Sequence, residues 1–272
     1  MTKKLTNTLI RLIGKAGPCK RSFQVAGVDG CRAGWFVVII SVVKKGSGAN
    51  VTCIFNSKDF FLAKTFAEVL SKTTNCKLVC VDIPIGLSDG EKPRECDVVA
   101  RKILRGGRAS SIFPPPIRPC LSAKDSETAS RICFKYSGKK LNRQSFFILP
   151  KVREVNQAMT PQLQRRVCEI HPELAFWALN GKKPMQHKKR QLAGRNERMR
   201  LLSTIFPDVG QLVAKARKPK EVAPDDILDA LAAAWTASQI VSGKAETLPK
   251  NQELDSKGLR MEILYPAPIV DE

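Results

Sequence analysis

The fold class is decided by residues 23–43, which read FQVAGVDGCRAGWFVVIISVV. Residues 24–29 form a short apolar run that ends at Gly30, and residues 35–43 form a β-branched run of strand length. The turn-forming residues 31–34 between the two runs predict a tight connection. We therefore expect two antiparallel strands joined by a short turn.

The pattern that follows extends this pair into an α/β fold. A third strand is expected at 51–55, apolar positions with a period near 3.6 predict a helix over 59–72, and residues 77–82 form a continuous apolar strand. A strand without alternation is typical of one that is covered on both faces. The resulting order is β-β-β-α-β. Further helices are expected at 94–105, 121–136, 174–179, 196–205 and 224–242, with a fifth strand at 165–170 and an edge strand at 258–265.

Composition places the chain among globular proteins. Of its 272 residues, 43% are hydrophobic and 26% are charged, so it can bury a core and is neither disordered nor fibrous. The longest apolar run, residues 35–40, is far shorter than the roughly 20 residues that cross a bilayer, so we expect no membrane span. We expect a basic N-terminal tail at 1–22 and one domain at 23–272, with an insertion at about 90–164.

The nine cysteines are odd in number, scattered and without a C-x-x-C pair, and only two histidines could complete a zinc site. Several lie in apolar segments, where a thiol behaves as a small hydrophobic group. Disulfides are rare in a reducing compartment. We therefore expect free thiols, no structural zinc and a cytoplasmic location.

The chain is strongly basic, with 46 Lys and Arg against 25 Asp and Glu and a net charge of +21. Its densest basic run, residues 182–200, contains eight basic residues and one acid. Such a surplus favours a polyanionic partner, because Lys and Arg bind phosphate and release its counterions. Nucleic acid, either DNA or RNA, is therefore the expected partner, with a solvated surface run as the alternative.

Four aspartates lie where a site could form. Asp29 and Asp82 each end an apolar strand, and the carboxyl ends of strands are where α/β sheets build binding sites. Asp226 and Asp229 are three residues apart, which places both on one face of the first turn of a helix. Each could instead be a turn or helix cap. Together they would form the oxygen ligand set of Mg²⁺, and two such ions would activate a water and stabilise the leaving oxygen of a phosphodiester.

The order of elements, with acids after the first and fourth strands and a late helical pair, resembles the ribonuclease H-like fold. The spacing of Asp226 and Asp229 is similar to that of RuvC-type resolvases. The chain resembles more closely a family of predicted ribonuclease H-like nucleases, over residues 27–243. The matching blocks are GVDGCRAGW at 27–35, DIPIGL at 82–87, RxxDxxAR at 94–101, RxSSIFP at 108–114, KVREV at 151–155, EIHPE at 169–173 and DDILDAL at 225–231.

This resemblance implies a ribonuclease H-like α/β fold: a mixed sheet with a β-β-β-α-β core, helices on both faces and a helical or loop insertion before the fifth strand. It implies a divalent-metal-dependent nuclease that uses Mg²⁺ or Mn²⁺, with Asp29, Asp82, Asp226 and Asp229 as the metal-binding and catalytic carboxylates. Glu169 is a fifth catalytic candidate. Candidates for binding substrate phosphate are Arg101, Arg108, Lys151, Lys188 and Lys189.

Other functions stay open at this point. A non-catalytic nucleic-acid-binding protein could keep the fold, although four acids in so basic a chain would repel phosphate unless a metal neutralised them. An actin-like sugar kinase or ATPase shares the fold but needs two such domains, and residues 27–243 supply one. A resolvase-like cleaver of symmetric junctions would be expected to form a homodimer. His171 is expected to be a histidine near the rim of the core.

Overall fold

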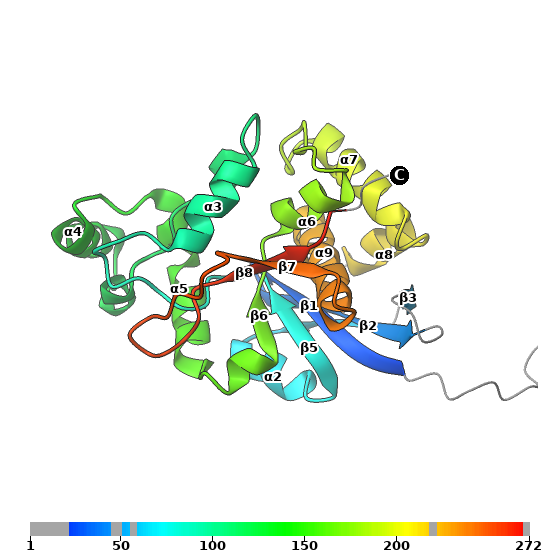
Figure 1. Cartoon of the computed structure of the whole chain (residues 1–272), viewed down its shortest axis with the longest axis horizontal. Coiled ribbons are helices and arrows are strands. Elements are labelled where there is room, and N and C mark those ends of the chain that lie inside the picture. Colours follow the sequence, from blue (N-terminus) through cyan, green and yellow to red (C-terminus); the bar gives the residue numbers. More distant parts are fainter. Residues whose placement is uncertain (1–21, 45–50, 55–58, 218–221, 269–272) are drawn as a thin grey trace, which may run out of the picture.

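The centre of the structure is a mixed β-sheet with the strand order β3-β2-β1-β5-β6 (Figure 1). The computed structural model describes residues 22–44, 51–54, 59–217 and 222–268. The expected mixed α/β class is confirmed, and none of the helices in these ranges has the length and apolar character of a membrane span. The strands β1 (Ser22–Cys31), β2 (Gly34–Lys44) and β3 (Val51–Ile54) are antiparallel neighbours, and β5 (Cys76–Val81) and β6 (Val167–Glu169) run parallel to β1.

The helix expected over 59–72 is correct only in its second half. Phe60–Ala63 form the strand β4, which pairs antiparallel with β2, and the helix α2 spans Phe66–Lys72. Aromatic and branched side chains favour a strand beside an open sheet edge. The N–H of Ile39 extends this pairing by donating to the carbonyl oxygen of Asp59 over 2.7 Å. The open edge of β2 therefore outweighs the helical period of the first residues.

Side chains along each strand alternate between two faces of the sheet, and each face has its own core. One core contains Val25 of β1 and Cys80 of β5. It is covered by α6 (Pro172–Leu179), α7 (Leu192–Ser203), α8 (Val209–Ala216) and α9 (Pro224–Val241). The other core contains Ala26 and Val81 and is covered by α2 and α5 (Arg143–Ala158). The position of a residue along its strand therefore decides which helices it meets.

A long segment separates β5 from β6. It contains α3 (Glu95–Ile103), α4 (Ser126–Ser137), α5 and three single-turn helices, η1 (Ala109–Ser111), η2 (Arg118–Ser122) and η3 (Leu163–Arg165). Figure 1 shows α3, α4 and α5 on the other side of the picture from α7 and α8. Helix α5 is unexpected, because Pro150 in its middle removes a backbone donor. Packing of Val152 and Val155 against the sheet stabilises it.

A separate two-stranded antiparallel sheet, β7 (Ala245–Leu248) with β8 (Ile263–Pro266), follows α9. The edge strand expected over 258–265 therefore begins later and pairs with β7 rather than with the main sheet. Leu264 of β8 forms a parallel bridge with Ile170, the residue after β6. The expected tail, apart from Ser22, lies outside the described residues.

Candidate active site

Asp29 and Asp82 lie side by side at the carboxyl edge of the sheet. Strands β1 and β5 are parallel neighbours in which Val28 pairs with Val81, and the N–H of Asp82 donates to the carbonyl oxygen of Val28 over 3.0 Å. Asp82 follows Cys80 by two residues, so alternation places its side chain on the face that carries α9. The same alternation from Val25 places Asp29 there.

Helix α9 brings the second pair of aspartates to this edge. A Cβ atom on Gly27 would lie 2.1 Å from both the carbonyl oxygen of Ala230 and the backbone nitrogen of Ala234, so the helix backbone rests directly on β1. Asp229 precedes the contact residue Ala230, and Asp226 lies one turn earlier. The absence of a side chain at Gly27 therefore allows Asp226 and Asp229 to approach Asp29.

We call Asp29, Asp82, Asp226 and Asp229 the carboxylate cluster. Asp29 and Asp229 are buried, with 7% and 1% of their surface exposed, whereas Asp82 and Asp226 are half-buried. Burial raises the pKa of Asp29 well above its ordinary value, and the charges of Asp82 and Asp229 raise it further. Burial also raises the pKa of Asp82, Asp226 and Asp229 to about 6. The structure thus brings the four predicted aspartates together.

Lys189 is the cation that contacts this cluster. Its Nζ lies 2.5 Å from Oδ2 of Asp229. Burial disfavours the charged form of Lys189, but the carboxylates of Asp229, Asp29 and Asp82 outweigh burial and hold its pKa above the ordinary value. The basic run predicted a phosphate-binding lysine here. The ion pair with Asp229 has no signal in the sequence, because the two residues are 40 positions apart.

Asp226 also caps its own helix. The backbone N–H of Ala223 donates to Oδ2 of Asp226 over 3.1 Å, the contact that an acidic residue makes in the first turn of a helix. One carboxylate oxygen of Asp226 therefore caps the beginning of the helix. The capping interpretation of Asp226 is confirmed by this contact, and its role in a metal site stays a prediction.

The structure does not bring Glu169 into the cluster. Glu169 follows Val167 by two residues on β6, and Val167 belongs to the core under α5, so Glu169 faces away from α9. Arg94 donates to both of its carboxylate oxygens, over 2.5 and 2.9 Å, and the N–H of Ile85 donates over 2.6 Å. Burial raises the pKa of Glu169 to about 7, although Arg94 opposes the shift. Arg94 also pairs with Asp97 at 3.0 Å.

This buried ion network positions the segment that follows Asp82. Arg94 donates to the carbonyl oxygens of Ile85 and Gly86 over 3.3 and 2.9 Å, while Glu169 accepts from the N–H of Ile85. The N–H of Ile85 and the carbonyl oxygens of Ile85 and Gly86, which follow β5, thereby have hydrogen-bond partners. Glu169 and Arg94 therefore fix the chain three residues beyond Asp82.

Most of the predicted phosphate-binding residues have internal partners. Arg101 donates to the carbonyl oxygen of Ile112, Arg108 donates to Glu173 over 3.3 Å, and Lys151 donates to the carbonyl oxygen of Gly34 over 2.5 Å. Lys188 is exposed. His171 caps α6, since its Nδ1 accepts from the N–H of Glu173 over 3.2 Å, and burial lowers its pKa. His171 is half-buried, and the helix cap that it forms is not part of the expectation of a histidine near the rim of the core.

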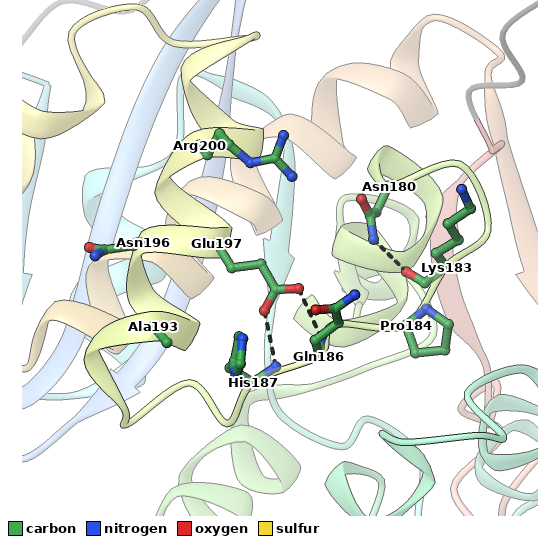
Figure 2. Close-up of a pocket in the computed structure, with 9 residues that line it drawn as sticks. All are labelled: Asn180, Lys183, Pro184, Gln186, His187, Ala193, Asn196, Glu197 and Arg200. Carbon is green, nitrogen blue, oxygen red and sulfur yellow. Dashed lines mark hydrogen bonds between the residues drawn. The ribbon is translucent and has the colours of Figure 1, made fainter.

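A hollow of about 440 Å³ lies beside the segment that carries Lys189 (Figure 2). Its polar lining includes Asn180, Lys183, His187, Asn196 and Arg200, all within or close to the basic run. The carboxylate cluster does not line this hollow. The hollow therefore belongs to the surroundings of the site rather than to the site itself.

The donor chemistry of the carboxylate cluster suits a hard divalent cation, because Asp29 interacts electrostatically with the other three carboxylates and Lys189 supplies one ammonium. In the observed arrangement, no three acidic, histidine or cysteine side chains of the described ranges are placed to hold one ion. The ammonium of Lys189 contacts Asp229 instead. The structure therefore contains a set of candidate ligands but no assembled metal site among the described residues.

A match to a protein family covers the part of the chain that contains the blocks quoted above. A family model described as "Protein of unknown function (DUF429)" matches residues 27–254. No curated protein matches the chain. Among solved structures, RuvC of Thermus thermophilus is similar at 14% identity, covering 81% of this chain and 97% of that chain with a TM-score of 0.35. That score is too low to bear on the fold, which rests here on strand order and register. Because the family model spans most of the 272 residues, the protein belongs to the DUF429 family.

Proposed function

We propose that the carboxylate cluster is the active centre of a divalent-metal-dependent nuclease of ribonuclease H-like fold, which hydrolyses phosphodiester bonds of DNA or RNA. One observation carries this proposal: four aspartates from three separate segments converge at the carboxyl edge of the sheet, beside the helix that rests on Gly27. Clustered buried carboxylates repel one another and cost stability, which makes a purely structural role unfavourable.

In this proposal Asp29, Asp82, Asp226 and Asp229 hold Mg²⁺ or Mn²⁺. When bound, such ions supply an activated water and stabilise the leaving oxygen of the phosphodiester. The buried Asp29 and Asp229 fix the inner ligand positions, and the half-buried Asp82 and Asp226 lie toward solvent, from which a substrate phosphate would approach. Glu169 acts as a positioning residue through the segment after Asp82.

The charge of the chain supports nucleic acid as the substrate. A net charge of +21 gives general attraction for phosphate backbones. Lys188 is exposed in the segment that precedes α7, and Lys183 and Arg200 line the neighbouring hollow. All three cations belong to the basic run at 182–200, which also carries Lys189. They would position a substrate without reading its sequence.

A cleavage assay tests the proposal. Wild type, Asp29→Asn and Asp225→Asn are incubated with Mn²⁺ or Mg²⁺ and labelled four-way junctions, RNA–DNA hybrids and single strands. Asp225 is the matched control, because it is the neighbour of Asp226 and its loss changes net charge equally. Metal-dependent cleavage by wild type and Asp225→Asn, lost in Asp29→Asn, is the expected result.

Binding of these nucleic acids without cleavage by wild type would contradict the nuclease proposal. It would favour the alternative, a non-catalytic nucleic-acid-binding protein, which the basic charge of the chain supports on its own. Equal cleavage by wild type and Asp29→Asn would place the activity outside the carboxylate cluster.

A further inference from the structure

Lys189 lies against the carboxylate cluster rather than on an open surface. Its Nζ is 2.5 Å from Oδ2 of Asp229, whose side chain is 2% exposed. Its charge also acts on Asp29 and Asp82, which belong to the neighbouring strands β1 and β5. One ammonium therefore faces carboxylates from three segments of the chain.

The backbone of the segment that carries Lys189 is hydrogen-bonded to side chains of α7. Figure 2 shows the carboxylate of Glu197 accepting from the N–H groups of Gln186 and His187, at 2.8 and 3.1 Å. Arg198 donates to the carbonyl oxygen of His187 over 3.2 Å. The backbone two and three residues before Lys189 is thus held from two positions on the helix.

Buried groups complete this attachment. Arg198 is fully buried and pairs with Glu173 of α6 at 2.5 Å. A Cβ atom on Gly194 would lie 2.1 Å from the carbonyl oxygen of Lys188, so α7 packs directly on the residue next to Lys189. A lysine whose side chain only extends into solvent does not need its backbone to be held in place in this way. The molecule therefore holds the base of the Lys189 side chain within reach of Asp229.

We propose that Lys189 competes with a divalent cation for the same carboxylate oxygen of Asp229, and so lowers the affinity of the carboxylate cluster for Mg²⁺ or Mn²⁺. This inference rests on the proposed function, because it takes the cluster as a cation site. A tethered competitor is present at high effective concentration, whatever the concentration of protein. Entry of the divalent ion moves the ammonium away by rotation of a long side chain that is 38% exposed, while its backbone stays bound to α7.

Calorimetric titration of Mn²⁺ into wild type, Lys189→Met and Lys188→Met tests this competition. Lys188→Met is the matched control, because it removes the same charge from an exposed neighbour of Lys189. We expect Lys189→Met to bind Mn²⁺ about tenfold more tightly than wild type, or tighter still, since a charge-assisted hydrogen bond no longer has to be broken. Lys188→Met should bind as wild type does.

Chemical labelling of wild type gives a second measurement that needs no variant. Acetylation by an N-hydroxysuccinimide ester, quantified by mass spectrometry, should become several-fold faster at Lys189 in saturating Mn²⁺, with Lys188 as the internal reference. Displacement of the ammonium from Asp229 would expose it to the reagent. An unchanged or slower reaction at Lys189 would overturn the inference.

The outcomes separate this inference from the proposed function. Equal Mn²⁺ affinity in wild type, Lys189→Met and Lys188→Met overturns the competition but leaves the metal site in place. Weaker binding by Lys189→Met than by Lys188→Met, with both proteins folded, also overturns it and assigns Lys189 a supporting role. An absence of Mn²⁺ binding by all three folded proteins, with nucleic acid present as well, contradicts the proposed function and this inference together.

Discussion

Gly27 lies so close to Ala230 that a Cβ atom at position 27 would be 2.1 Å from the carbonyl oxygen of Ala230. This approach joins β1, which carries Asp29 near its end, to the helix that carries Asp226 and Asp229. The alanine-rich sequence of α9, including Ala230 and Ala234, provides the matching flat surface. The carboxylate cluster thus depends on a contact in which neither partner has a large side chain.

We predict that Gly27→Ala separates β1 from α9. Overpacking in a core costs about 1–3 kcal/mol, and here the obstacle is backbone rather than a flexible side chain. Thermal unfolding should show a lower melting temperature, and Mn²⁺ binding should weaken. The control is Gly107→Ala, since no atom lies within 4 Å of a Cβ at Gly107. Its stability should stay within about 0.5 kcal/mol of wild type. If Gly27→Ala were as stable as Gly107→Ala, the close contact between Gly27 and α9 would be contradicted.

In the metal-free protein, the titration of Asp82 should lower the free energy of unfolding as pH rises from about 4 to about 7. The pKa of Asp82 is raised to about 6 by burial, against roughly 3.9 in an unfolded chain. The folded state therefore retains a proton that the unfolded state releases, and this advantage disappears as pH passes the folded pKa. Asp82→Asn lacks this titration, so its stability relative to wild type should rise by about 1–2 kcal/mol across this range, allowing for solvent screening.

Chemical denaturation in EDTA at several pH values measures this difference. In the opposite trend, the stability of wild type would increase relative to that of Asp82→Asn as pH rises. This would mean that the ionised carboxylate of Asp82 has stabilising partners in the fold. That result would remove the electrostatic argument for a cation site at this position.

The network around Glu169 predicts a contrast between stability and metal binding. Arg94→Met leaves the carboxylates of Glu169 and Asp97 buried without their cation, which should cost about 3–5 kcal/mol. Glu169→Gln keeps the shape of the side chain and should cost less. Because Gln keeps an oxygen that can accept from the N–H of Ile85, and because the side chain faces away from α9, this variant should bind Mn²⁺ as wild type does. A folded Glu169→Gln protein that fails to bind Mn²⁺ would instead support the role that family resemblance suggested.

Local patterns were sufficient for the parts of the site that depend on one element. The apolar runs correctly place Asp82 directly after β5, whereas Asp29 lies two residues before the end of β1, because pairing with β2 continues to Cys31. The helical period of α9 places Asp226 and Asp229 on one face. Long-range contacts were beyond such patterns. The face on which a strand residue lies depends on register and packing, which the sequence alone does not show. The sequence therefore predicts Glu169 as a partner of the four aspartates, although it lies on the opposite face of the sheet.

The same distinction explains the differences in the fold. Phe60–Ala63 have a helical period but pair with the open edge of β2. Pro150 argues against a helix in the sequence, yet α5 forms around it because packing against the sheet stabilises the helix. The contact of Lys189 with Asp229 joins two segments 40 residues apart and leaves no local signal. In each case the deciding interaction is tertiary.

Calorimetric titration of Mn²⁺ into wild type and Asp29→Asn tests the central claim most directly. Asp29→Asn should fold and, without metal, be at least as stable as wild type, because burial and two neighbouring carboxylates disfavour the charge of Asp29. The account predicts Mn²⁺ binding by wild type and binding at least about tenfold weaker by Asp29→Asn. Equal affinity in the two proteins, or no binding by wild type even with a cleavage-resistant phosphorothioate oligonucleotide present, would contradict it.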